Sequence, residues 1–140
     1  MSREIKFRGK RLDNNKWVCG YYSFNPFLKR AEIYSFDDVR SYVYEVIPES
    51  VGQYTGLRDS KLTAEYPEGQ EVYEGDIVRV LREDSFKPYI AEVYFSGGCY
   101  GTTWFHPIEN RSIFKPIFDW DVEVIGNVFD NPDLISDKGE

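Results

Sequence analysis

This chain has a single histidine, His106, which limits the catalytic schemes open to it, and two cysteines, Cys19 and Cys99. A cysteine becomes a catalytic nucleophile when a base lies within hydrogen-bonding reach, so Cys99 with His106 is the pair to consider. The sequence supplies nothing that would orient the histidine or form an oxyanion hole. We therefore interpret His106 as the end of a strand before Pro107, and we expect no enzyme activity and no cofactor.

Two groups of carboxylates have the oxygen ligands that bind hard cations. The first group contains Glu71, Glu74 and Asp76, and the second contains Asp119, Asp121 and Glu123. Neither group follows the spacing of a calcium-binding loop, and acidic side chains are common in exposed turns and strands. We expect no metal site, and a metal-assisted hydrolase at the first group is the alternative.

Three glycines lie near turns but not in a phosphate-binding loop, because the sequence has neither GxxxxGK[ST] nor GxGxxG. In EVYEGDIVRV (71–80), Gly75 can adopt the positive φ of a tight turn, and Asp76 can bond nearby amides. This corner predicts a turn into a buried strand. Gly52 and Gly56 predict a close backbone contact or a bulge.

Basic residues alternate with apolar ones at the start of the chain, which predicts a half-buried strand. Successive basic residues on one strand face lie about 7 Å apart, which is comparable to neighbouring phosphates of a nucleic acid strand. Rings on the following strand offer stacking surfaces for bases. The candidate partner surface consists of Lys6, Arg8, Lys10, Trp17, Tyr21 and Tyr22. We favour subunit pairing or a structural use, such as protecting a strand edge, over nucleic acid or another protein.

Charge is unevenly distributed along the chain. The net charge is −7, but residues 1–16 carry +4 and the remaining residues carry −11. Such asymmetry predicts a partner or a self-contact. The acidic remainder would repel a polyanion, and it also motivates an alternative function as an acidic decoy that mimics DNA.

Aromatic residues form 17% of the chain, which favours β-sheet. Alternating or β-rich runs between turn residues predict strands at 5–10, 17–24, 31–36, 41–47, 50–57, 77–81, 89–95, 99–105 and 120–129. Residues 58–70 predict a polar surface loop, and residues 131–133 predict a short helical turn. We expect a mainly β protein, a small barrel or sandwich. It forms one domain (1–140), with two small lobes, about 1–57 and 71–134, as the alternative division.

The cysteines also bear on the compartment, because they lie far apart and form no CxxC motif. We expect both to be buried or half-buried thiols in a reducing cytoplasm. No apolar run approaches the roughly 20 residues that span a bilayer, and MSREIKFRGKRL lacks the apolar core of a signal peptide. We therefore expect a cytoplasmic protein that does not enter the membrane.

Three segments, in this order, together resemble the YopX family of bacteriophage and prophage proteins. They are REIKFRGKRLDNNKWVCGYY (3–22), PESVGQYTGL with VYEGDIV (48–57 and 72–78), and VEVIGNVFDNPDL (122–134). The resemblance spans nearly the whole chain, and VGQYTGL is its strongest part. The interval between Leu57 and Val72 is longer here than in relatives. The resemblance implies a mostly β fold with an SH3-like barrel and self-association, and it carries no catalytic residue to this chain.

The leading hypothesis is a phage-derived, non-enzymatic β module that acts through self-assembly and protein contacts. We expect a homo-oligomer in the bacterial cytoplasm, with a phage or host protein as a further partner. The alternatives are a nucleic-acid-binding accessory protein that uses the basic N-terminal strand, and the acidic decoy.

Overall fold

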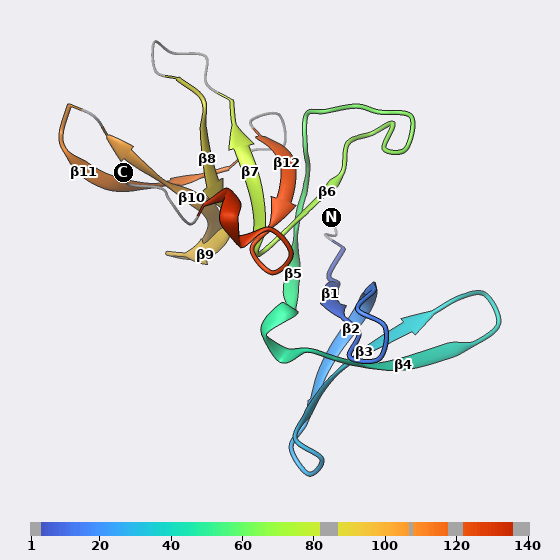
Figure 1. The fold of residues 1–140 in the computed structure, drawn as a ribbon. Helices are drawn as coiled ribbons and strands as arrows, with labels where there is room; N and C mark the ends of the chain where they lie inside the picture. Colours follow the sequence, from blue (N-terminus) through green and yellow to red (C-terminus); the bar gives the residue numbers. More distant parts are fainter. Residues whose placement is uncertain (1–3, 82–86, 107, 118–121, 136–140) are drawn as a thin grey trace. The chain divides into compact units, whose positions relative to one another are not determined.

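The computed structural model describes residues 4–81, 87–106, 108–117 and 122–135. These residues are mainly β, and their helical structure consists of two short 3₁₀ turns. The chain divides into two compact units, Met1–Gly56 (unit 1) and Leu57–Glu140 (unit 2) (Figure 1). In the part of the chain that is described, no helix is long and apolar enough to cross a membrane.

Unit 1 is one antiparallel sheet of consecutive hairpins. Its elements are β1 Phe7–Lys10, β2 Trp17–Asn25, β3 Arg30–Phe36, β4 Ser41–Val46, the 3₁₀ turn η1 Pro48–Ser50, and β5 Gly52–Arg58, whose last two residues belong to unit 2. The strands lie in the order β4-β3-β2-β1-β5. Side chains close two of the turns: Asn25 accepts the amides of Phe27 and Leu28, and Asp37 accepts those of Val39 and Arg40.

The core of unit 1 lies on one face of this sheet. Its fully buried residues are Ala31, Ile33 and Val46, and Phe7, Val18, Tyr44 and Val51 pack against them. Alternation places these residues on one face, since Ala31 and Ile33 are two residues apart on β3, as are Tyr44 and Val46 on β4. The end of β4 is tied to the β1–β2 turn, since the Leu12 amide donates to the Glu45 carbonyl and the Ile47 amide donates to the Lys10 carbonyl.

Unit 2 contains two three-stranded antiparallel sheets in its described residues, in the orders β12-β7-β8 and β11-β10-β9. Its elements are β6 Glu71–Tyr73, β7 Asp76–Val80, β8 Tyr89–Glu92, β9 Tyr94–Ser96, β10 Cys99–His106, β11 Arg111–Pro116, β12 Val122–Asn127 and the 3₁₀ turn η2 Pro132–Leu134. Strand β6 pairs with β5. The core residues are Val72, Val78, Val80, Val93, Ile117 and Val122.

The polar segment after β5 is anchored at both ends, although residues 61–68 are exposed. Asp59 is buried, and its Oδ1 and Oδ2 accept the amides of Gln70 and Val124 at 2.8 and 2.9 Å. The amide and hydroxyl of Ser60 both donate to the Val122 carbonyl. This segment is therefore fastened to β12.

The prediction of a mainly β chain is confirmed, as is the short C-terminal turn. No sheet in the described residues closes into a barrel, so SH3-like character is not confirmed. The predicted strand 89–95 is two strands, because residues 89–92 pair with β7 whereas residues 94–96 pair with β10. Strand β11 was not predicted, because its sequence RSIFKP has only two apolar residues before a proline.

Candidate interaction surface on unit 1

The basic stripe, which consists of Lys6, Arg8 and Lys10, follows an internal strand of unit 1. Arg8 is paired with Cys19 of β2 on one side and with Gly52 of β5 on the other. Strand β1 therefore has no unpaired edge at this point, and the interpretation that the stripe protects an exposed edge is wrong. Phe7 packs toward the core, so the basic side chains lie on the opposite, outer face.

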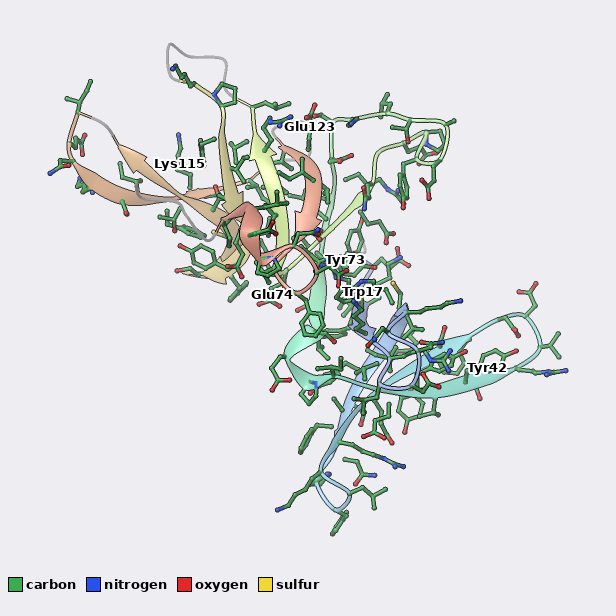
Figure 2. All side chains as sticks on the ribbon, viewed as in Figure 1. Trp17, Tyr42, Tyr73, Glu74, Lys115 and Glu123 are labelled. Carbon is green, nitrogen blue, oxygen red and sulfur yellow. The ribbon has the colours of Figure 1, made fainter. Side chains whose placement is uncertain are left out.

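Each basic side chain of the stripe lies over an aromatic ring. The Lys6 Nζ is 5.2 Å from the centre of the Tyr54 ring, while the Arg8 Cζ and the Lys10 Nζ are 4.7 and 5.7 Å from the centre of the Trp17 ring. The Lys6 Nζ also lies 3.4 Å from Glu4 Oε2. A cation over a ring face is attracted by its negative quadrupole, so the stripe is held against unit 1. A base stacking on Trp17, labelled in Figure 2, would compete with these contacts.

The aromatic residues predicted for this surface do not all share one face. Trp17 and Tyr21 both lie on the outer face of β2, with Cys19 between them on the same face. Tyr22 lies on the other face, where its ring centre is 5.7 Å from that of Phe7. The predicted surface therefore keeps five of its six residues, and it loses Tyr22 because neighbouring strand residues point to opposite faces.

An apolar patch on the outer face was missed from the sequence. Tyr21 lies directly opposite Tyr34 on β3, and Tyr34 lies directly opposite Val43 on β4. The ring of Phe36 meets Tyr21 edge-on at 5.8 Å. The exposed fractions are 60% for Tyr21, 59% for Phe36 and 52% for Val43. We call Tyr21, Tyr34, Phe36 and Val43 the apolar patch; the signal for it was that AEIYSF and SYVYEVI are apolar on both alternating faces.

Acidic residues lie next to the patch along the same two strands, β3 and β4. Glu32 and Glu45 are directly opposite each other on these strands. Arg30 lies between them, with its Nε 3.1 Å from Glu32 Oε2 and its Nη1 3.8 Å from Glu45 Oε1. The Glu32 side chain is 8% exposed and that of Glu45 is 42% exposed, so Glu45 is the carboxylate that reaches solvent. This trio carries a net charge of −1.

The predicted carboxylate groups do not form a metal site in the residues that the structure describes, where no cluster of three or more metal-ligating side chains occurs. Glu71 Oε2 lies 3.6 Å from Arg58 Nη2, and Glu71 Oε1 accepts the Tyr73 hydroxyl. In the second group, Glu123 lies 3.5 Å from Arg79. Asp119 and Asp121 lie outside the described residues.

The Gly75–Asp76 corner forms a hydrogen-bonded turn. Gly75 has φ +93°, and the buried Asp76 accepts the Tyr73 amide at 2.7 Å through its Oδ2. Glu92 ends β8 and is paired with Ile77, just after this turn. Burial and the charge of Glu74 raise the pKa of Glu92. The other two glycines lie in β5, where Gly52 is buried opposite Arg8 and Gly56 has φ +90°.

The cysteine–histidine pair is not formed. Cys99 begins β10 and His106 ends it, so seven strand steps of about 3.3 Å place their backbones roughly 23 Å apart. The Cys99 thiol lies 3.6 Å from the Ser96 carbonyl, and neither Cys99 nor the exposed Cys19 forms a disulfide. Both cysteines are thiols, and Cys99 is half-buried as predicted, but the prediction of a buried or half-buried Cys19 is wrong because this residue lies exposed on β2.

Comparison with known proteins identifies the family of this chain. Residues 6–136 match the family described as YopX protein. The chain is also similar to the crystal structure of protein EF1440 from Enterococcus faecalis, at 18% identity and a TM-score of 0.48, over 96% of this chain and 100% of that one. A search of curated proteins found no match. Because the family match covers nearly the full length of the chain, the chain belongs to the YopX family.

Proposed function

We propose that this protein is a non-enzymatic β module that acts through self-assembly and contacts with other proteins. The apolar patch is the observation that supports the proposal. Single exposed apolar residues are ordinary, whereas a contiguous group across three neighbouring strands is typical of an interaction site. Aromatic residues at its centre and charged residues around it match the composition of protein interfaces.

The non-enzymatic part of the proposal has two supports. Cys99 and His106 lie at opposite ends of one strand, so the nucleophile–base pair that the sequence offered is too far apart for proton transfer. The carboxylates of the first acidic group have structural partners: Glu71 is paired with Arg58, and Asp76 caps the turn before β7. Phage origin and a bacterial cytoplasmic setting are part of the same proposal, and the family membership supports the first.

Nucleic acid binding through the basic stripe is less well supported, because the stripe lies over Tyr54 and Trp17. The acidic-decoy alternative is supported by the charge of unit 2. Residues 57–140 carry 8 basic and 17 acidic groups, a net of −9, whereas residues 1–56 carry 9 basic and 7 acidic groups, a net of +2. A salt-dependent affinity for DNA or RNA that Lys6→Glu abolishes would favour the first alternative, and capture of a basic host DNA-binding protein would favour the second.

Sedimentation velocity over a wide range of protein concentration tests the proposal. We expect the mass of the wild type to rise above that of one chain, and the Tyr21→Ser, Phe36→Ser double variant to sediment as a monomer. Ile108→Ser is the matched control, because Ile108 is 79% exposed in unit 2 and outside the patch. A wild type that stays monomeric and binds no protein would overturn the proposal.

A further inference from the structure

We propose that the turn between β2 and β3 binds the surface of an anionic lipid bilayer, with Phe27 and Leu28 entering the interface and Lys29 meeting the headgroups. The inference goes beyond the proposed function, because it does not depend on self-assembly or on the apolar patch. We call the segment between Asn25 and its pairing partner Arg30 the β2–β3 tip; it ends the light-blue hairpin in Figure 1.

The apolar side chains of the β2–β3 tip have no role in the core of unit 1. Phe27 is 93% exposed and Leu28 is 58% exposed. Phe24, which precedes the tip on β2, is 50% exposed. Single exposed apolar side chains are ordinary, whereas neighbouring ones at the end of a hairpin are typical of an interaction site.

The backbone of the β2–β3 tip suits a medium with little water. Pro26 has no amide N–H, and Oδ1 of Asn25 accepts the amides of Phe27 and Leu28, both at 3.0 Å. The first three residues of the tip therefore present no unsatisfied amide to a lipid interface, where such a group is costly. The same hydrogen bonds hold the turn in one conformation before binding, which lowers the entropic cost of binding.

The charge of the β2–β3 tip complements anionic headgroups. No acidic residue lies between Asp13 and Glu32 in the sequence. Lys29 is exposed, whereas the charge of Arg30 is shared with Glu32 and Glu45. Lys29 also has φ +55°, a left-handed conformation that glycine or asparagine adopts more readily, so the turn itself does not explain a lysine at this position.

Two other turns carry a highly exposed apolar residue beside acidic ones. Val39, which is 86% exposed, follows Asp37 and Asp38 between β3 and β4. Ile108, which is 79% exposed, precedes Glu109. Acidic neighbours repel anionic headgroups, whereas the β2–β3 tip combines apolar with basic side chains. That combination is typical of segments that lie in a lipid interface.

The sequence predicted a protein that does not enter the membrane, because no apolar run is long enough to span one. A contact at the lipid surface needs no such run, since its strength depends on the apolar area that enters the interface and on attraction to anionic lipids. An apolar pocket of another protein is the alternative occupant. Such a pocket gains from backbone amides with which it can pair, and the first three residues of the tip offer none.

Co-sedimentation with vesicles tests the inference. The probes are vesicles of phosphatidylcholine alone and mixed vesicles of phosphatidylcholine and phosphatidylglycerol, and we expect the wild type to bind the mixed vesicles more tightly. The Phe27→Ser, Leu28→Ser double variant is expected to lose about tenfold or more in binding to them. Lys29→Asn keeps a residue that tolerates the positive φ, and it is expected to lose about fivefold on mixed vesicles only. Val39→Ser is the matched control and should bind like the wild type.

The outcomes decide between lipid and protein as the occupant of the tip. A wild type that binds neither kind of vesicle would overturn the inference and leave the tip to a protein partner. A double variant that binds as tightly as the wild type would overturn it by placing the lipid contact elsewhere, and so would an equal loss in Val39→Ser. Circular dichroism checks that each variant is folded, which is expected because all the substituted side chains are exposed.

Discussion

Asp59 fastens the segment between β5 and β6 to the last strand of unit 2, and its removal is expected to destabilise that unit. The side chain is 5% exposed, and its two oxygens accept the Gln70 and Val124 amides at 2.8 and 2.9 Å. Asp59→Ala leaves both amides without these acceptors. The neighbouring Ser60 contact to Val122 depends on the same backbone position, so it is expected to weaken with it.

The cost follows from the two hydrogen bonds. A hydrogen bond to a charged group contributes about 1.5–3 kcal/mol, and the lower end applies where water can reach a partly exposed donor. Gln70 and Val124 are both half-buried, so we expect Asp59→Ala to lower the free energy of unfolding by about 3–4 kcal/mol. That is a large part of the roughly 5–15 kcal/mol by which small domains are stable. Asp59→Asn keeps one acceptor and turns an NH₂ group toward the other amide, so about half of the cost remains.

Urea unfolding measures the loss of stability, and amide hydrogen exchange at Val124 and Gln70 locates it in unit 2. The matched control is Glu68→Ala, an exposed acidic residue of the same segment, which is expected to change stability by about 0.5 kcal/mol or less. The reasoning would be refuted if Asp59→Ala cost no more than the control, or if Asp59→Asn were as stable as the wild type.

Three further substitutions test other parts of the structure. Burial and Glu74 raise the pKa of Glu92, so the wild type loses stability as the pH rises from below the ordinary carboxyl value of 4.5 through that raised pKa. Glu92→Gln should therefore raise the melting temperature at neutral pH but not in acid, and an equal effect at both would contradict the assignment. Gly75→Ala is expected to cost about 1–2 kcal/mol because φ is +93°, more than Gly97→Ala at φ +60° in open space; equal costs in thermal unfolding would be evidence against this backbone argument. Ile33→Ala removes a fully buried side chain from unit 1 and should cost about 2–5 kcal/mol in urea unfolding, and a loss below about 1 kcal/mol would show that this core is not packed as described.

Local features of the fold could be predicted from the sequence because they depend on neighbouring residues. Period-two alternation located most strands, and Gly75, with φ +93°, lies in the turn that the Gly75–Asp76 corner predicted. Strand β11 could not be found in this way, because it carries only Ile113 and Phe114 as apolar residues and is held by its ladder to β10. Tertiary pairing, and not local propensity, makes that segment a strand.

The candidate surface likewise depends on pairing between strands that are distant in the sequence. Alternation placed the basic stripe on one face, but the sequence could not show that β1 is covered on both edges, because its β5 partner is more than forty residues away. The apolar patch also depends on non-local register: Tyr21, Tyr34 and Val43 become neighbours only through two ladders. Tyr22 was assigned to the surface by proximity in sequence, although alternation alone would have placed it on the other face.

The central claim, that the outer face of unit 1 is where copies of the chain meet, has a direct test in the reactivity of two thiols. Cys19 is exposed on that face, opposite Arg8 and next to Tyr21 in the alternation of β2, whereas Cys99 lies in unit 2 and serves as an internal control. The measurement is the rate of thiol labelling at each cysteine as the protein concentration is raised. The account predicts that labelling of Cys19 slows as the chains associate while labelling of Cys99 does not change. A Cys19 rate that stays constant while the mass in solution increases would contradict it and would place the contact elsewhere.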